Sequence, residues 1–474
     1  MTNLSGANLH NGVAVGPKGE GMDSPSRFPT YPAYKDSGVE WLGEVPNHWE
    51  SRRLKFLFSL QKRPVVDGDG IVTCFRDGAV TLRSNRRTDG FTNAEKEIGY
   101  QGIRKGDLVI HAMDAFAGAI GVSDSDGKSS PVYSACTPNE GVSAYYYARL
   151  LRHMALAGFV SSLAKGIRER STDFRWSDAS EIYLPFPSIL EQTQIARFLD
   201  HETARIDALI EEQQRLIELL KEKRQAVISH AVTKGLDQTA PMKDSGVEWL
   251  GEVPAHWQVK RLKHLVPSIT VGIVVEPSKY YVDDGVPALR SLNVKPGAVV
   301  AENLVYLSEE SNELHAKSKI FEGDIVAVRS GQPGTAAIVP LEFNGANCID
   351  LIVIRKPLQG CSTFIFWYLN SDAALKQFSE GTSGAIQQHF NIAAASEMLF
   401  AWPPASEQLE INRHLDRACH QLDRLISVAG ESKSLLLERR SALISTAVTG
   451  KIDVRDWQPP ASTQAPKLEV AEAD

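Results

Sequence analysis

Residues 35–49 read KDSGVEWLGEVPNHW, and residues 243–257 repeat them with one change, from Asn47 to Ala255. A repeat with so long a period joins whole domains, because the units of a solenoid follow one another every ~20–50 residues. The sequence therefore predicts an internal duplication in which each copy is a large folded segment.

A second pair of repeated segments closes each copy. Glu191-Gln192 returns as Glu407-Gln408, and ISHAVT at 228–233 returns as ISTAVT at 444–449. The long interiors between the opening and closing repeats barely resemble each other. Constant borders around unlike interiors indicate one scaffold that presents two different recognition surfaces.

Long helices are predicted at 188–235 and 405–455. The first starts with Ser188 and Glu191, a spacing that forms a capping box, and it follows two prolines. Apolar residues then recur every three or four positions until a glycine, which is a natural stop. Such a run is about 65 Å long at ~1.5 Å per residue, and its narrow apolar stripe needs a partner. The second helix is the expected antiparallel partner, although Gly430 could bend it.

The interiors carry strand-like signals. Residues 325–328 and 350–354 are rich in β-branched side chains and are bounded by Gly, Pro and Asn. The run GDLVI at 106–110 matches GDIV at 323–326, which predicts that the two interiors share a fold.

We therefore expect an α+β protein. It has two mixed α/β domains, which together with their border segments cover 31–187 and 236–404. The long antiparallel, coiled-coil-like helices separate these domains, and a pseudo-twofold internal duplication relates the two copies. The polar ends, 1–30 and 456–474, are expected to be disordered tails.

Composition places few limits on the function. A net charge of −7 argues weakly against a nucleic-acid binder, but residues 50–107 hold twelve Lys and Arg against eight Asp and Glu. Any basic surface is therefore local. Five cysteines without metal-binding spacing favour a reducing cytoplasm and no zinc site. No apolar run approaches the ~18 residues of a membrane span.

The repeated border, the Glu-Gln pair that opens a long helix and the two unlike α/β interiors resemble the specificity subunits of type I restriction–modification systems. The resemblance covers about residues 35–455. It implies that each interior is a target recognition domain for one half of a split site in double-stranded DNA. It also implies that the helices hold the two halves apart and dock two methyltransferase subunits, which a restriction (motor and nuclease) subunit joins.

The duplication fits that function on physical grounds as well. Half-sites on one face of B-DNA lie at multiples of about 34–36 Å, a separation that a long helical strut can span. Two unlike recognition domains predict an asymmetric site, whereas two identical ones would read a palindrome.

Candidate DNA contacts in the first interior are Arg and Lys side chains with one Asn. Arg can pair with guanine and Asn with adenine, and the alternative is a basic turn that contacts only phosphates or solvent. They are Arg83, Asn85, Arg86, Arg87, Lys165, Arg168, Arg170 and Arg175.

In the second interior, a glycine-containing loop corresponds to the segment around Arg170. By the family resemblance this loop approaches the DNA, and the alternative is a polar loop that closes the domain. The candidates of this interior, from the loop and from two other turns, are Arg290, Asn293, Lys295, Arg329, Gln332, Gln387, Gln388 and Asn391. The repeated tryptophans are expected to be structural.

The sequence contains no motif for catalysis. Trp402-Pro403-Pro404-Ala405 lacks the polar and aromatic residues of an adenine methyltransferase loop, and no phosphate-binding GxxxxGK[ST] is present. We expect no catalytic or metal-binding residues and no cofactor in this chain, with S-adenosylmethionine, ATP and Mg in partner subunits. The alternative is a non-catalytic protein scaffold whose duplicated domains bind proteins.

Overall fold

The computed structural model describes residues 28–86, 97–163, 174–330, 334–357, 359–380 and 390–460. The chain forms two compact units. The first consists of Met1–Glu212 with Ser432–Asp474, and the second consists of Gln213–Glu431. Both boundaries fall inside the long helices, so each unit contains one half of each helix.

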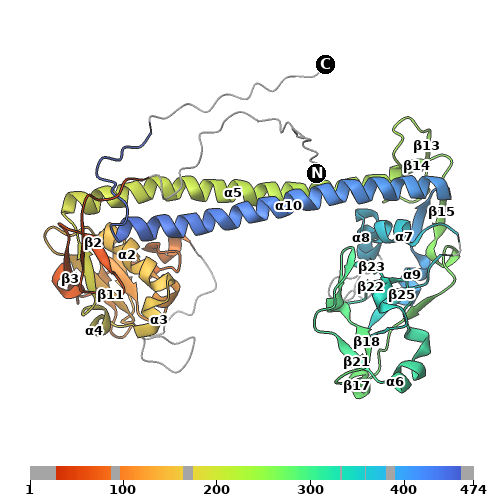
Figure 1. Ribbon diagram of the computed structural model, residues 1–474, viewed down its shortest axis with the longest axis horizontal. Helices are drawn as coiled ribbons and strands as arrows, with labels where there is room; N and C mark the ends of the chain where they lie inside the picture. Colours follow the sequence, from red (N-terminus) through yellow and green to blue (C-terminus); the bar gives the residue numbers. More distant parts are fainter. Residues whose placement is uncertain are drawn as a thin grey trace, which may run out of the picture. The chain divides into compact units, whose positions relative to one another are not determined.

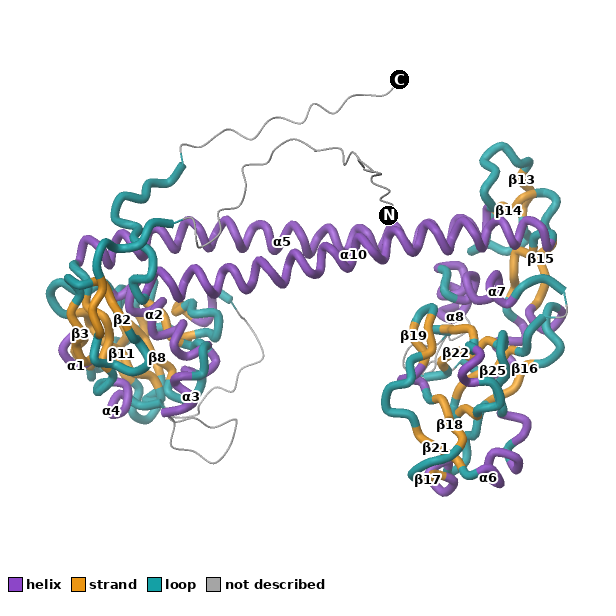
Figure 2. The backbone as a smooth tube through the Cα atoms, viewed as in Figure 1, coloured by secondary structure: helices purple, strands orange, loops and turns teal. Residues whose placement is uncertain are grey.

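The first unit is built on a four-stranded antiparallel sheet with the order β4-β11-β8-β9. Figure 2 labels two of these strands, β8 and β11. The helix α2 (Ala144–Leu156) packs against this sheet and buries Tyr146 and Tyr147 completely. The sheet strands are β4 (Phe58–Leu60), β8 (Leu108–His111), β9 (Ile120–Val122) and β11 (Tyr133–Pro138). The other elements are β1 (Tyr34–Asp36), β2 (Glu44–Pro46), β3 (Glu50–Arg53), α1 (Leu54–Leu57), β5 (Val72–Cys74), β6 (Val80–Leu82), β7 (Gln101–Ile103), β10 (Gly127–Ser129), α3 (Phe159–Leu163), α4 (Trp176–Ala179) and β12 (Tyr183–Phe186).

The second unit contains a sheet of the same topology, with the order β16-β25-β22-β23. Its strands are β16 (Ile269–Val271), β22 (Ile325–Val328), β23 (Ala336–Ile338) and β25 (Leu351–Ile354). The match of 106–110 with 323–326 therefore marks equivalent strands, β8 and β22, and the predicted common fold is confirmed.

A second four-stranded sheet, β17-β21-β18-β24, distinguishes this unit from the first. It is joined by the short helix α6 (Glu309–Leu314). Its strands are β17 (Tyr281–Val282), β18 (Val286–Leu289), β21 (Val305–Leu307) and β24 (Asn347–Cys348). The other elements are β13 (Met242–Asp244), β14 (Glu252–Pro254), β15 (Gln258–Arg261), β19 (Val294–Lys295), β20 (Ala298–Val299), α7 (Ser362–Leu369), α8 (Asp372–Glu380), α9 (Ile392–Glu397) and β26 (Leu399–Trp402).

The two predicted long helices are confirmed as α5 (Ile189–Lys234) and α10 (Ala405–Val448) (Figure 1). The expected capping box is present, because the Ser188 hydroxyl accepts a hydrogen bond from the backbone N–H of Glu191 at 3.3 Å. Gly430 does not interrupt α10, which is one continuous helix.

Within each unit the two half-helices pair antiparallel. In the first unit Arg440 of α10 forms a two-fold hydrogen-bonded ion pair with Asp207 of α5, at 2.7 and 3.2 Å. Gln194, further toward the start of α5, donates to the carbonyl oxygen of Val454, which lies beyond the end of α10. In the second unit Arg224 of α5 contacts Asp423 of α10 at 2.8 Å.

The repeated border and the repeated Glu-Gln pair contact each other in both units. In the first, the Glu191 carboxylate accepts from His48 Nε2 at 2.8 Å and from Trp49 Nε1 at 3.3 Å. In the second, Glu407 makes the same bonds with His256 and Trp257, at 2.8 and 3.0 Å. Trp49 and Trp257 are completely buried, which confirms that these tryptophans are structural.

The glutamine of each pair forms its hydrogen bonds with backbone groups, not with side chains. Gln192 Nε2 donates to the carbonyl oxygens of Gly141 and Pro187, and its Oε1 accepts from the N–H of Ser143. Gln408 makes the corresponding bonds, to the carbonyl oxygen of Pro403 and from the N–H of Cys361. The Glu-Gln pair therefore joins the helix to both the border and the interior, which explains why it is repeated.

These contacts predict a pH dependence of stability. Burial acts to raise the pKa of Glu191, but hydrogen bonds from His48, Trp49 and Ser188 outweigh burial and hold this pKa below its usual value. A carboxyl with a depressed pKa contributes stability above its unfolded-state pKa and loses it as the pH falls through the folded pKa. We expect Glu191→Gln to cost about 2 kcal/mol of unfolding free energy at pH 7 and to reduce the acid-induced loss of stability.

Urea titrations of both proteins between pH 7 and pH 3 measure this effect. The matched control is Glu50→Gln, an exposed carboxylate of the same unit. The prediction would be contradicted if the unfolding free energy of the Glu191 variant fell with pH as steeply as that of the unmodified protein.

Candidate nucleic-acid interface

A groove lies at one edge of the main sheet in the first unit, where β4 and β8 end and β11 begins. Its volume is about 1200 Å³. The lining residues with polar or aromatic side chains are Gln61, Lys62, Arg63, Tyr100, Gln101, Tyr133, Ser134, Arg175, Trp176 and Ser177. Three cations and three aromatic rings in one groove match the needs of a phosphate backbone and of bases that stack or pair.

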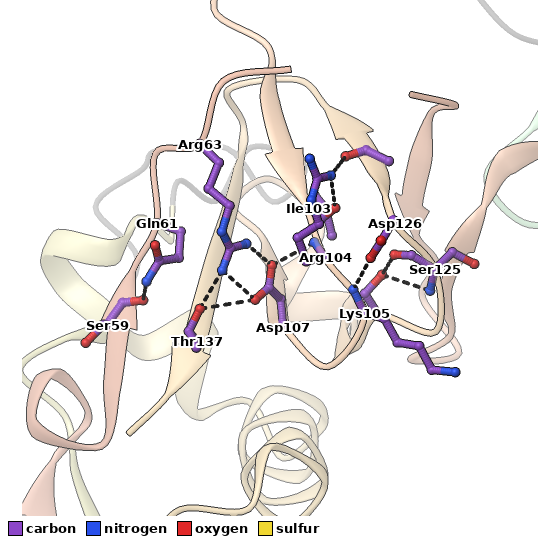
Figure 3. Close-up of polar contacts among 12 residues, drawn as sticks. Ser59, Gln61, Arg63, Ile103, Arg104, Lys105, Asp107, Ser125, Asp126 and Thr137 are labelled. Carbon is purple, nitrogen blue, oxygen red and sulfur yellow. Dashed lines mark hydrogen bonds and ion pairs between the residues drawn. The ribbon is translucent and has the colours of Figure 1, made fainter. Parts of the chain in front are cut away.

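Arg63 is fixed in this groove by a buried carboxylate. Both of its Nη atoms donate to Asp107, and Nη2 also donates to Thr137 Oγ1 at 2.7 Å (Figure 3). Asp107 is only 3% exposed and accepts in addition from the backbone N–H of Arg104 at 2.9 Å. The aspartate therefore closes the turn before β8 and holds the guanidinium of Arg63 at the groove.

The second unit uses the same aspartate in the same turn. Asp324 accepts from the backbone N–H of Phe321 at 3.0 Å and from Arg355 Nη1 at 2.6 Å. Here the arginine follows β25, whereas Arg63 follows β4. The turn is thus common to both domains, and the cation that it holds comes from a different strand.

Phe174 and Phe390, which follow the two loops predicted to approach DNA, are held in the same way. The backbone N–H of Phe174 donates to the carbonyl oxygen of Ala112 after β8, and that of Phe390 donates to the carbonyl oxygen of Arg329 after β22. Both phenylalanine rings are buried. The next residue in each loop is therefore placed at the same edge of its own sheet. This residue is Arg175 in the first unit and Asn391 in the second.

At this edge the second unit presents different chemistry. Arg329 Nη1 contacts Asp350 Oδ1 at 2.6 Å, and Asp350 has a positive φ of 51°, which is uncommon for a residue with a side chain. Asn391 accepts from the backbone N–H of Ala394 and so caps α9. The equivalent groove edge of the first unit has the cations Lys62, Arg63 and Arg175.

Of the candidates in the first interior, Arg175 lines the groove. Arg83 and Asn85 lie in the turn after β6, where they donate to Thr73 and Thr81 at 3.2 and 2.8 Å. Arg86 pairs with Asp77 and lies over the ring of Phe75. These three are not among the groove-lining residues. Arg87, Lys165, Arg168 and Arg170 lie outside the described residues.

In the second interior, Asn293 must be removed from the candidates. Its side chain is completely buried, its Nδ2 donates to the carbonyl oxygens of Val300 and Glu302, and its Oδ1 accepts from the N–H of Arg290. These bonds use its acceptor and both of its donors inside a turn.

The remaining candidates of the second interior lie either in described turns and strands or outside the described residues. Arg290 donates to the carbonyl oxygen of Asn303 at 2.6 Å, and Lys295 is exposed on β19. Gln332, Gln387 and Gln388 lie outside the described residues.

Sequence reasoning missed most of the groove. Gln61, Lys62 and Arg63 follow β4 directly, and Tyr100 and Gln101 lie in a separate loop and strand. The basic excess in residues 50–107 was the available signal. The segments are brought together by long-range contacts, namely the pairing of β4 with β11 and the bond from the N–H of Gly102 to the carbonyl oxygen of Arg63.

The described residues carry neither the pattern of a metal site nor that of a membrane-spanning helix. Within the described ranges, no group of His, Cys, Asp or Glu side chains has the arrangement of a metal site. None of the described helices is both long and apolar enough to cross a membrane.

No protein-family profile matches the chain. Curated relatives do. The MjaVIII specificity subunit of a type I restriction enzyme from Methanocaldococcus jannaschii is 25% identical over 58% of this chain, and the match spans 63% of that protein's length. The putative MjaX specificity subunit of the same organism is 23% identical over 87% of this chain and 96% of its own length. The EcoKI specificity subunit of Escherichia coli K12 is 22% identical over 68% of each chain.

Solved structures agree in fold. A chain from a type I restriction–modification system aligns with a TM-score of 0.65 and 15% identity, over 86% of this chain and 99% of that one. The HsdS subunit from Thermoanaerobacter tengcongensis aligns with a TM-score of 0.50 and 16% identity, over 86% and 98%. The chain is therefore similar in sequence to type I restriction enzyme specificity subunits, and it shares the fold of the solved structures of such systems.

Proposed function

We propose that this chain is a non-catalytic, sequence-specific DNA-binding subunit that reads a split and asymmetric site. The observation that carries the proposal is the pair of sheets with one topology and unlike groove edges. One edge offers Lys62, Arg63 and Arg175, and the other offers the Arg329–Asp350 pair and Asn391. Each unit therefore reads a different half-site.

Within the first groove, we assign phosphates to the cations and bases to the amides. Lys62 is exposed, and a flexible ammonium is suited to a phosphate. The Nε2 atoms of Gln61 and Gln101 each donate one hydrogen bond to a backbone carbonyl oxygen, of Ser59 and of Tyr133. Each amide thus keeps one donor and its acceptor oxygen for adenine in the major groove. In the second unit, the loop that ends at Asn391 has the corresponding role.

The long helices set the separation of the two half-sites. Each spans more than 40 residues without a break, because α5 has 46 residues and α10 has 44. A continuous, paired helix resists compression and so keeps a fixed length. The length of the helices therefore determines how many unread base pairs separate the two half-sites.

The helices also offer equivalent docking positions for partner subunits. Leu219 and Leu435 occupy matching positions in the two repeats and are 52% and 65% exposed. Each has a second exposed leucine within one helical turn of it, Leu216 at 43% and Leu437 at 49%, and neighbouring exposed apolar side chains are candidates for a protein contact. We propose that two methyltransferase subunits dock here and that a restriction subunit joins them. Those partners supply S-adenosylmethionine, ATP and Mg, and the complex acts in the cytoplasm, where the five free cysteines stay reduced.

Single-molecule methylation mapping of the host genome tests the proposal. We expect one asymmetric, two-part methylated motif that disappears when this chain is deleted. A methylome that is unchanged by the deletion would leave only the protein-scaffold alternative.

Two groove variants separate phosphate contacts from base contacts. Lys62→Ala should weaken binding to every DNA sequence alike and lower the slope of log affinity against log salt by about 0.9. Gln61→Ala should cost about 1–3 kcal/mol on the cognate half-site only. Gel shifts of the assembled methyltransferase complex at several salt concentrations measure both quantities.

The control is Lys105→Ala, an exposed lysine of the same unit that does not line the groove. If all three variants behave alike, the groove does not bind DNA.

A further inference from the structure

A second cavity of the first unit lies between α2 and the paired halves of α5 and α10. Its volume is about 410 Å³. Its walls come from four places: α2, the turn at Asp77-Gly78, strand β9 and the helix pair. Three large apolar side chains line it and remain about half exposed, namely Tyr145 at 57%, Leu156 at 57% and Leu437 at 49%. The cavity is therefore accessible and has an apolar lining at its exposed side.

Three arginines also line this cavity: Arg149, Arg152 and Arg440. Two of them have carboxylate partners, since Arg149 pairs with Asp200 and Arg440 pairs with Asp207. The third does not. Arg152 donates only to backbone carbonyl oxygens, from Nε to Gly118 and from Nη2 to Arg76, both at 3.2 Å. Among the described residues no ion pair of Arg152 is present.

Among the other titratable groups near the cavity, Asp77 and Asp207 act to raise the pKa of Arg152, but each forms its ion pair with another arginine. Asp77 pairs with Arg86 outside the cavity. Burial lowers the pKa of His153, so this ring stays neutral at pH 7. Burial and then the charge of Arg440 lower the pKa values of both Arg149 and Arg152. At and beside the cavity the four arginines Arg86, Arg149, Arg152 and Arg440 thus share three carboxylates, Asp77, Asp200 and Asp207, and Arg152 is the arginine without an ion pair of its own among the described residues.

We propose that this cavity binds a small organic anion, with a phosphate or carboxylate group at Arg152 and an apolar body against Tyr145 and Leu156. An oxyanion beside Arg152 would use the donors that the two carbonyl oxygens leave unoccupied. The volume lies within the range of about 300–1,000 Å³ that small-molecule sites have.

The second unit has a different structure at the equivalent place, after α7. There Gln225 of α5 donates to the carbonyl oxygen of Asn370 at 2.9 Å. The backbone N–H of Asp372 donates to Ser229 Oγ of α5 at the same distance. These bonds tie the interior directly to the helix. The anion site therefore belongs to the first unit and is not a general consequence of the duplicated fold.

Calorimetric titration of the purified full-length chain with three probes tests the proposal. Inorganic phosphate supplies the oxyanion alone, phenyl phosphate adds an apolar ring, and benzyl alcohol supplies the ring without charge. We expect phenyl phosphate to bind about ten-fold or more tightly than inorganic phosphate, and benzyl alcohol not to bind measurably.

Arg152→Gln should weaken phenyl phosphate by about ten-fold or more, and Arg152→Lys should restore part of that loss. Tyr145→Ala should remove the advantage of phenyl phosphate over inorganic phosphate and leave the binding of inorganic phosphate unchanged. The matched control is Arg197→Gln, an exposed arginine of α5 that does not line the cavity. Thermal unfolding of each variant shows whether it is folded.

Equal binding of phenyl phosphate by the unmodified chain and Arg152→Gln would overturn the proposal, as would no binding by the unmodified chain. If phenyl phosphate does not bind but Arg152→Gln weakens assembly with the methyltransferase subunit, the occupant is an acidic side chain of that partner, and the small-anion proposal is wrong. Should Arg152→Gln not fold, the comparison of Tyr145→Ala with Arg197→Gln decides the outcome. None of these results depends on DNA recognition.

Discussion

Four residues inserted after Glu212 in α5, together with four after Glu431 in α10, should change the methylated motif of the cell. Both half-sites should stay the same while the unread spacer grows. Each insertion adds about 6 Å of helix at ~1.5 Å per residue, which is close to two base pairs of B-DNA. Because both insertions fall at the boundaries of the two units, the Asp207–Arg440 and Arg224–Asp423 pairs on either side keep their partners.

The effect on the original site should be large. Two base pairs change the position and the rotation of one half-site, so a complex that still binds one half-site must give up the other. We expect methylation of the original motif to fall by about 100-fold or more, which corresponds to the loss of about 3 kcal/mol or more of half-site contacts. The four residues also turn each helix about 40° beyond a full turn, which should lower the affinity for the new motif somewhat.

The control inserts the same four residues into the exposed turn at Asp283-Asp284, which lies outside both helices. This insertion should leave the spacer unchanged. Methylation mapping that finds the old spacer with the helix insertions in place would refute the helical strut as the determinant of spacing.

Asp107→Ala should abolish recognition of one half-site and should also destabilise the first unit. The substitution removes the carboxylate that holds Arg63 and leaves the backbone N–H of Arg104 without its acceptor (Figure 3). Breaking a buried ion pair by removing one partner costs about 3–5 kcal/mol. The Arg63 side chain is only 25% exposed, so water cannot replace the carboxylate fully.

The duplication offers a matched control for this experiment. Asp324→Ala removes the equivalent carboxylate of the second unit, which Arg355 and the backbone N–H of Phe321 contact. It should affect the other half-site and leave the first intact. Binding to DNA with one half-site scrambled, together with the unfolding free energy, separates the two variants. If both variants lose the same half-site, the assignment of one half-site to each unit is wrong.

The repeated borders and the two long helices could be predicted from the sequence, because their signals are local. The capping box at Ser188 and the regular apolar spacing of α5 need no knowledge of distant residues. The strand order could not be predicted. The strands of the main sheets have three to six residues, too few for a pattern, and β4 pairs with β11 across more than 70 residues of chain.

The candidate site was predictable only where it lies beside a strong local feature. Arg175 follows Phe174 in a loop that the family resemblance marked, and it lines the groove. Asn293 shows the opposite case. A polar residue in a turn looks available for recognition, but its amide satisfies the backbone of the turn itself. Composition does not distinguish a groove-lining residue such as Arg175 from a turn residue such as Asn293. The difference depends on which backbone groups nearby need a hydrogen-bond partner.

The attachment of each interior to its helix has an evolutionary consequence. The hydrogen bonds of the Gln192 side chain go to backbone groups, at Gly141, Ser143 and Pro187, and those of the Glu191 carboxylate include His48 and Trp49 of the border and Ser188. These hydrogen bonds therefore do not depend on which side chains the interior carries at those positions, whereas side chains of α2 such as Tyr146 and Arg149 also contact the helices. A gene conversion or crossover between the repeated border and helix codons can deliver a foreign interior in which the hydrogen bonds of the Glu-Gln pair still form, provided that its α2 equivalent packs on the helices. A host lineage can thus acquire a new methylation pattern in one recombination event, without first accumulating compensating mutations in the shared framework.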